Sequence, residues 1–153
     1  MAREPRGKYY EDMNVGDVYP TGQRTVTATD IVNFACLTGD FNEVHSNHEF
    51  VKNTEHGEPI AHGPLVYAIC GGLSYATGNS EGTLLALLGI DNWRMLKTVK
   101  HGDTIFMEEE VTAKRLTSKP GRGVITFDRR IINQRGEIVH TMTANKLYKC
   151  REG

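Results

Sequence analysis

The second half of the chain alternates apolar and polar residues, and a period of two is typical of β-strands. Ile105, Met107 and Val111 alternate in this way with Thr104, Phe106 and Thr112. A Gln-Arg-Gly-Glu turn at 134–137 joins the last two β-rich segments as a hairpin. The strand segments that we predict after residue 82 are 84–88, 104–112, 124–132 and 138–148.

A first amphipathic helix is predicted directly after residue 27. Thr27 is suited to cap its start, and Ile31, Phe34 and Ala35 fall on one helical face. Gly39 is a suitable C-terminal stop, since glycine adopts the left-handed conformation that often ends a helix. This helix therefore leads the chain directly to the carboxylate of Asp40.

A second helix is predicted to begin at Pro64, because proline is favoured in the first turn of a helix. The segment 65–73 is apolar on nearly all sides, which predicts a buried helix. The pair Gly71-Gly72 lowers its intrinsic helix propensity, so packing must stabilise it, and Gly78 ends it.

These elements predict one domain over residues 1–153, of the α+β class. A buried helix would pack on an antiparallel sheet. A strand within 18–26 and a short helical turn at 48–52 complete the prediction, and residues 1–13 form an N-terminal tail that either docks or stays loose.

Composition narrows the function classes. The formal net charge is −1, from 18 basic and 19 acidic residues, which favours neither a nucleic-acid partner nor a membrane surface. Cys36, Cys70 and Cys150 are widely spaced, which indicates a reducing compartment. The chain has neither the apolar core of a signal peptide at its start nor a membrane-spanning apolar run, so we expect a cytoplasmic protein.

Candidate chemistry lies in Gly39-Asp40-Phe41-Asn42-Glu43-Val44-His45. Asp40 and His45 are five residues apart, so their side chains converge on a turn and not on a regular helix. A carboxylate and an imidazole that share a water can exchange protons with it near neutral pH. Asn42 is expected to orient the water or a substrate carbonyl.

The pair His62-Gly63 stands just before the buried helix. The backbone N–H of Gly63 is one of the unpaired donors of a helix start and lies at the positive end of the helix dipole. Such a donor can stabilise an oxyanion, and glycine permits close approach of a ligand. His62 is a second substrate-site candidate, although capping of the helix start is its simpler role.

Other polar and sulfur-containing residues have plainer interpretations. His45 and His48 are three apart, but no carboxylate or cysteine cluster completes a recognisable metal-ligand spacing, so we expect no metal. We expect Met95 and Met107 to fill the core and Cys36 and Cys70 to be small buried residues. We expect Arg94, Lys97 and Lys100 to be surface charges that could also meet phosphate groups. The histidines expected to be solvated are His48, His56, His101 and His140.

The segment 37–45 resembles the signature of the MaoC-like, (R)-specific enoyl-CoA hydratases, and His62-Gly63 before an apolar helix resembles their second motif. Weaker similarities lie at Trp93-Arg94, 99–104 and 133–139. The resemblance extends from about Thr27 to Tyr148, which is nearly the whole chain.

The resemblance implies a hotdog fold, in which an antiparallel sheet wraps around a long central helix. It implies a homodimer or higher homo-oligomer, with an acyl-CoA substrate at or near the subunit interface and no cofactor besides that CoA. Asp40 and His45 would be the acid/base pair, Asn42 an orienting residue and Gly63 the oxyanion donor. Two positions depart from the family pattern: Glu43 stands where a proline is usual, and Gly71 where some members have a serine.

The reaction implied is reversible hydration of a trans-2-enoyl-CoA to the (R)-3-hydroxyacyl-CoA, which makes the protein a hydro-lyase. Three alternatives remain open at the level of the sequence. They are a dehydratase of branched, carboxylated or carrier-protein-bound acyl thioesters, an acyl-CoA thioesterase on the same scaffold, and a non-catalytic acyl-CoA-binding subunit.

Overall fold

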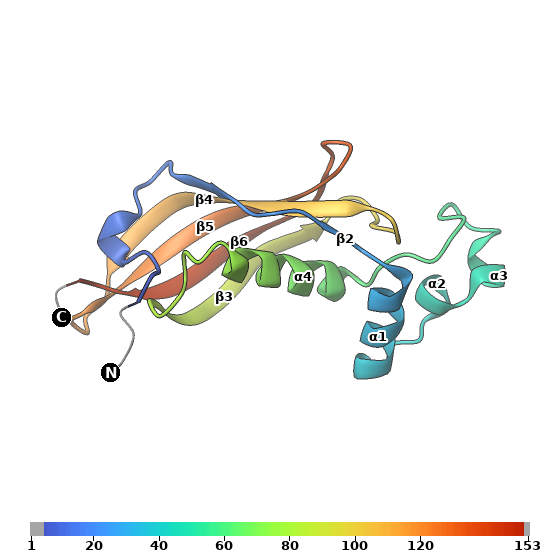
Figure 1. Ribbon diagram of the computed structural model, residues 1–153, viewed down its shortest axis with the longest axis horizontal. Helices are drawn as coiled ribbons and strands as arrows, with labels where there is room; N and C mark the ends of the chain where they lie inside the picture. Colours follow the sequence, from blue (N-terminus) through green and yellow to red (C-terminus); the bar gives the residue numbers. More distant parts are fainter. Residues whose placement is uncertain (1–4, 152–153) are drawn as a thin grey trace.

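The computed structural model describes residues 5–151 and contains one twisted antiparallel sheet (Figure 1). Its long strands follow the order β4-β5-β6-β3, with the short strands β1 and β2 paired to β4. The four segments predicted after residue 82 are all strands, and each extends beyond its predicted bounds: β5 at both ends, and β3, β4 and β6 at the C-terminal end. The strands are β1 Val18–Pro20, β2 Arg24–Thr25, β3 Leu84–Met95, β4 Thr104–Leu116, β5 Arg122–Asn133 and β6 Ile138–Lys149.

The longest helix, α4, runs along one face of this sheet, whereas three shorter helices gather beyond one end of it (Figure 1). This is the α+β arrangement implied by the hotdog resemblance, with the central helix packed on an antiparallel sheet. The helices are the 3-10 turn η1 Tyr10–Asp12, α1 Ala28–Thr38, α2 Glu43–Ser46, α3 His48–Val51 and α4 Gly63–Ala76.

The ends of α1 are fixed by local sequence signals. The Thr27 hydroxyl accepts a hydrogen bond from the Asp30 amide at 3.1 Å, and the Asp30 carboxylate accepts one from the Thr27 amide at 2.8 Å, which completes a capping box. Gly39 adopts a left-handed conformation with φ 78°, and its amide donates to the Ala35 carbonyl at 2.8 Å. The predicted cap and stop are confirmed, and Asp40 follows directly.

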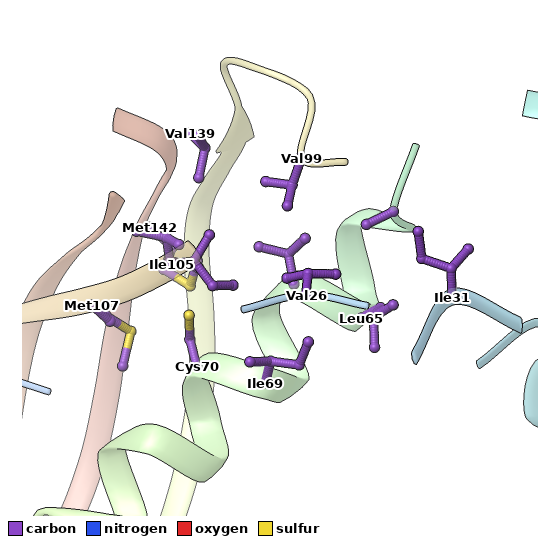
Figure 2. Packing of buried hydrophobic residues seen from close by; sticks show 13 residues of the cluster. Val26, Ile31, Leu65, Ile69, Cys70, Val99, Ile105, Met107, Val139 and Met142 are labelled. Atoms are coloured by element: carbon purple, nitrogen blue, oxygen red, sulfur yellow. The ribbon is translucent and has the colours of Figure 1, made fainter. Parts of the chain in front are cut away.

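The core lies between α4 and the sheet. In Figure 2, Leu65, Ile69 and Cys70 of α4 pack with Ile105 of β4 and Met142 of β6 in one buried cluster. Only one face of α4 is buried within a single chain. For the single chain, the prediction that this helix is buried on nearly all sides was therefore wrong. The residues of α4 that remain exposed beyond its first turn are Ala68, Gly71, Gly72, Tyr75 and Ala76.

A buried ionic cluster joins the C-terminal part of α4 to the sheet. The carboxylate of Glu109 accepts hydrogen bonds from Arg129 Nε at 2.8 Å, Lys146 Nζ at 2.8 Å and Ser74 Oγ at 2.6 Å. Burial disfavours the charged carboxylate, but the two cations outweigh that effect and the pKa of Glu109 lies below its usual value. The cluster therefore fixes β4, β5, β6 and α4 with respect to one another.

The N-terminal segment docks where the structure describes it. Gly7 donates its amide to the Glu81 carbonyl at 2.9 Å, and Met13 is buried. Residues 1–4 of the predicted tail lie outside the described residues. Within residues 5–151, no helix is both long and apolar enough to cross a bilayer.

Two predictions of buried sulfur residues were wrong. Cys36 is exposed because it lies on the face of α1 opposite Ile31 and Ala35, which are buried. Met95 is exposed because it ends the edge strand β3. The same prediction was right for Cys70 and Met107, both of which are buried in the core.

Candidate active site

Asp40, His45 and His62 converge at the N-terminal end of α4. One nitrogen or oxygen atom of each side chain lies within 4.8 Å of the other two. Asp40 comes from the loop after α1, His45 from the short helix α2, and His62 from the residue before α4. The turn that was expected between Asp40 and His45 is therefore present, with α2 as its second half.

Asn42 builds this turn. Its side-chain oxygen caps α2 by accepting from the Val44 amide at 3.3 Å, and its own amide donates to the carboxylate of Asp40 at 3.2 Å. The Ser46 hydroxyl closes the segment by donating to the Phe41 carbonyl at 3.0 Å. Asn42 thus holds the segment that carries Asp40 and His45, the two candidate acid/base residues.

The orientation of His45 leaves one ring nitrogen free. Its Nδ1 lies 2.8 Å from the carbonyl oxygen of Ile60, and a carbonyl only accepts, so Nδ1 carries the proton. In neutral His45 the lone pair is therefore on Nε2, which has no hydrogen bond to the described part of the chain. That nitrogen is available to accept a proton.

His62 is more central than the sequence indicated. It is 2 % exposed, and its ring stacks on that of His45 with 3.7 Å between centroids. Its Nε2 donates to the backbone carbonyl of Asp40 at 3.0 Å, and Phe34 covers it with 5.0 Å between ring centroids. Its side chain makes no hydrogen bond to the helix start, so the predicted capping role was wrong. His62 contacts both candidate acid/base residues.

We expect His62→Phe to lower kcat of the catalysed reaction by about tenfold or more, with a smaller change in KM. Phenylalanine retains a ring beside His45 but removes the donor to the Asp40 carbonyl, and small displacements of catalytic groups strongly reduce rate. Steady-state kinetics of His62→Phe beside Phe34→Leu, which perturbs the same packing without the hydrogen bond, would separate the two contributions. Equal losses in both variants would contradict a specific role for the hydrogen bond.

Gly63 is the first residue of α4, a helix of 14 residues, and its N–H has no acceptor within the described chain. A Cβ at this position would lie 2.3 Å from Sδ of Met95. The absence of a side chain therefore permits Met95 to lie against the helix start. The N-terminus of α4 points its positive dipole end toward this region.

Two cavities meet at His45. One, of about 400 Å³, lies between α1 and the α2–α3 segment and has mainly apolar walls that include Ile31 and Phe41. The other, of about 370 Å³, is lined by residues from α4, the end of β3 and β6, among them Gly63 and His140. Since His45 belongs to both walls, a ligand in either cavity would contact it.

His140 is buried, whereas the sequence predicted a solvated residue. It is 2 % exposed, and its Nδ1 accepts a long hydrogen bond of 3.5 Å from Trp93 Nε1. Burial lowers the pKa of His140 to about 4. The sequence does carry a signal for this burial. Every second residue of β6 faces the core, and His140 belongs to the same buried set as Met142 and Ala144.

This pKa predicts a pH-dependent stability. Between pH 6.5 and 4 the unfolded chain binds a proton at His140 that the folded chain excludes, so falling pH favours unfolding. We expect protonation of His140 to lower the free energy of unfolding by about 2 kcal/mol as the pH falls from 7.5 to 5. Urea unfolding at both pH values would show a smaller loss for His140→Gln than for the unsubstituted protein. Parallel losses in the two proteins would contradict the assignment.

Two of the three basic residues that the sequence singled out for a phosphate contact form ion pairs. Lys97 pairs with Glu137 at 2.6 Å, and Lys100 with Glu58 at 3.3 Å. Arg94 makes no ion pair within residues 5–151. The surface-charge interpretation therefore fits Lys97 and Lys100, and Arg94 stays a candidate for a phosphate contact.

The donor set of Asp40, His45 and His62 could also be compared with a metal site, since it offers a carboxylate and two imidazoles. Ligands of one ion must point their lone pairs at a common point. The rings of His45 and His62 are instead stacked, with 3.7 Å between centroids and planes inclined by 28°, and Nε2 of His62 already donates to the Asp40 carbonyl. The geometry fits proton transfer better than metal coordination.

Comparison with known proteins decides the family. The model of the MaoC like domain matches residues 13–128, which is most of the chain and includes both motifs. The chain belongs to the MaoC-like domain family. Its fold is the hotdog fold. The chain therefore lies within a family of hydratases and dehydratases.

Individual relatives of this MaoC-like chain include two curated proteins. It is 32% identical to the (R)-specific enoyl-CoA hydratase of Aeromonas caviae over 114 residues, which cover 74% of this chain and 80% of that protein. It is 37% identical to Protein MaoC of Klebsiella aerogenes over 118 residues, which cover 77% of this chain but 34% of that protein. The chain thus spans about a third of Protein MaoC.

Among solved structures, the monoamine oxidase regulatory protein of Archaeoglobus fulgidus superposes with a TM-score of 0.87 at 37% identity. The alignment covers 94% of this chain and 95% of that one. The similarity therefore extends over nearly the whole of both chains.

Proposed function

We propose that this MaoC-like protein reversibly adds water to a trans-2-enoyl-CoA and forms the (R)-3-hydroxyacyl-CoA. The observation that carries the proposal is the convergence of Asp40 and His45 beside the free N–H of Gly63. The reaction needs a proton acceptor and donor at one side of the double bond and a positive group at the carbonyl oxygen. The similarity to an (R)-specific enoyl-CoA hydratase supports this choice of reaction.

The proposed steps use the observed tautomer of His45. A water held between Asp40 and His45 gives a proton to His45 Nε2 as its oxygen bonds to C3 of the substrate. Negative charge moves to the thioester oxygen, where Gly63 N–H stabilises it. A proton then passes from the acid/base pair to C2. One water is added, no oxidation state changes, and no cofactor is required besides the CoA of the substrate.

The position of the substrate follows from the two cavities. With the thioester oxygen at Gly63, the reacting carbons lie beside His45, the residue that the cavities share. The mainly apolar cavity between α1 and α2 suits an apolar portion of the ligand. The other cavity would receive the portion around the carbonyl.

The proposal is tested with purified protein and crotonyl-CoA. Loss of the conjugated enoyl absorbance with formation of 3-hydroxybutyryl-CoA, and without release of free thiol, is the expected result. Release of free thiol from saturated acyl-CoA would instead support the thioesterase alternative. Tight acyl-CoA binding without turnover of any enoyl thioester would support a binding subunit.

The dehydratase alternative is retained because the family includes such enzymes. A relative in Bacillus subtilis is named for action on acyl-carrier-protein substrates. Comparison of rates on crotonyl-CoA with rates on branched, carboxylated and carrier-bound enoyl thioesters would rank these substrates. Addition of EDTA is expected to leave all of these rates unchanged, since no step uses a metal.

We also propose that the chain forms a homodimer through β3 and the exposed face of α4. The outer edge of β3 has no partner strand within residues 5–151, and Leu85, Leu87 and Leu88 on it are 43–53% exposed. A long apolar edge of this kind favours pairing with another chain. A second copy is a suitable occupant because the exposed glycines of the neighbouring α4 permit close approach.

Light scattering is expected to give twice the chain mass of 17.1 kDa. Leu88→Glu should shift the protein toward the monomer, because it places charge in the apolar interface. Leu116→Glu, at the end of β4 and also exposed, is the matched control and should leave the dimer intact. A monomeric unsubstituted protein would contradict the proposal.

A further inference from the structure

His140 is a buried imidazole that the proposed reaction does not yet use. It lies on β6 directly opposite Met95 of β3 in the strand register. The side chain of Met95 in turn lies against Gly63, the proposed donor to the carbonyl oxygen. Met95 therefore lies next to both His140 and Gly63. His140 and Gly63 line the same cavity of about 370 Å³.

The hydrogen bond from Trp93 defines the tautomer of His140. An indole N–H only donates, so the His140 Nδ1 that it contacts must present a lone pair. In the neutral ring the proton is therefore on Nε2. Trp93 itself packs against Tyr67 of α4, with 5.5 Å between ring centroids, so the residue that orients His140 is itself held in place.

The N–H at Nε2 has no acceptor among the described residues, although the atom is not sealed from solvent. The cavity shared with Gly63 is the open space that His140 lines. Its other walls include the apolar side chains of Ile60, Val66 and Val99. An N–H beside this cavity is available to a ligand that brings an acceptor, because no acceptor among the described residues competes for it.

The ring stays neutral under ordinary conditions because burial lowers the pKa of His140 to about 4. A neutral imidazole can donate a hydrogen bond to a carbonyl that gains negative charge without transferring its proton. Triosephosphate isomerase uses a neutral histidine in this way. The charge state and the tautomer of His140 are thus those of a donor.

We propose that His140 donates its Nε2–H to the thioester carbonyl oxygen of the bound acyl-CoA, as a second donor beside the Gly63 N–H. The inference rests on the proposed function, since it concerns the same substrate. His140 would contact the reacting group directly and would stabilise the enolate-like oxygen. Trp93 would act as a positioning residue through Nδ1.

The test compares His140→Leu, which removes the donor, with His140→Gln, whose side-chain amide keeps one. Met142→Leu, on the same face of β6, is the control for repacking. We expect kcat/KM for crotonyl-CoA to fall at least tenfold in His140→Leu and to be partly restored in His140→Gln, with Met142→Leu near the unsubstituted value.

A second readout avoids dependence on the folding of the variants. In the unsubstituted protein labelled at histidine, the Nε2–H resonance of His140 is expected to shift downfield when unreactive butyryl-CoA is added. A shift in a protein that hydrates no enoyl thioester would overturn the proposed reaction but support His140 as a carbonyl donor. An active enzyme with no shift, and with His140→Leu as fast as the unsubstituted protein, would overturn the inference.

Discussion

Replacement of His45 by alanine is expected to lower kcat/KM for hydration of crotonyl-CoA by roughly 10²- to 10⁴-fold, the usual contribution of a general acid/base group. The ring nitrogen that accepts the proton is lost. His62 is poorly placed to replace it, because its Nε2 is bound to the Asp40 carbonyl and its Nδ1 is buried away from solvent. Asp40→Asn should produce a loss of similar size, since the amide removes the negative charge that assists proton transfer.

The matched control for His45→Ala is His56→Ala. His56 lies in the same loop region, and its side chain makes no hydrogen bond or ion pair with the described residues. We expect its kinetics to match those of the unsubstituted protein. Full activity in both Asp40→Asn and His45→Ala would show that this pair is not the acid/base centre.

Replacement of Glu109 by alanine is expected to lower the free energy of unfolding by about 3–5 kcal/mol, the usual effect of removing one partner of a buried ion pair. Arg129, with a side chain 4% exposed, would keep its charge without a carboxylate, and Lys146, 6% exposed, would lose the partner that favours its charged form. Chemical denaturation with urea measures the change. A variant that fails to fold would agree with the upper part of this range.

Glu110→Ala provides the comparison for Glu109. The Glu110 carboxylate pairs with Arg130 at 3.2 Å, but both side chains are about a third exposed. Exposed pairs contribute about 0–1 kcal/mol, so the unfolding curve should move little. Equal shifts in the two variants would contradict the assignment of a specific role to the buried cluster.

Local signals explain why much of the site could be predicted from the sequence. The capping box at Thr27, the stop at Gly39 and the placement of Pro64 in the first turn of α4 each depend on neighbouring residues alone. They fix where Asp40 and Gly63 lie relative to their helices. The convergence of Asp40 and His45 then follows from the turn that separates them.

Other features of the structure depend on contacts between strands that are distant in the sequence. Glu109 alternates with Met107 and Val111 along β4 and so points inward with them, but its two cationic partners come from β5 and β6. His140 is inward because of its phase on β6, and its neighbour Val139 is buried too, at a register irregularity between β5 and β6. Sequence patterns do not specify such irregularities.

The stacking of His62 on His45 could not be predicted from the sequence either. The two residues are 17 positions apart, and the loop between them is polar and irregular. Their contact is set by α1 and α4, which hold Phe34 and the Asp40 carbonyl around the His62 ring. A histidine before a helix start is ordinarily interpreted from its immediate neighbours, which predicted a capping role that the structure does not have.

The most direct test of the central proposal is hydration of crotonyl-CoA in water enriched in oxygen-18, with chiral separation of the product. We expect the label at C3 of (R)-3-hydroxybutyryl-CoA, no label in a released carboxylic acid, and formation of this product at least about 10²-fold slower in His45→Ala. Label in free crotonic or butyric acid, or no product from any enoyl thioester, would contradict the account of this protein as a hydratase.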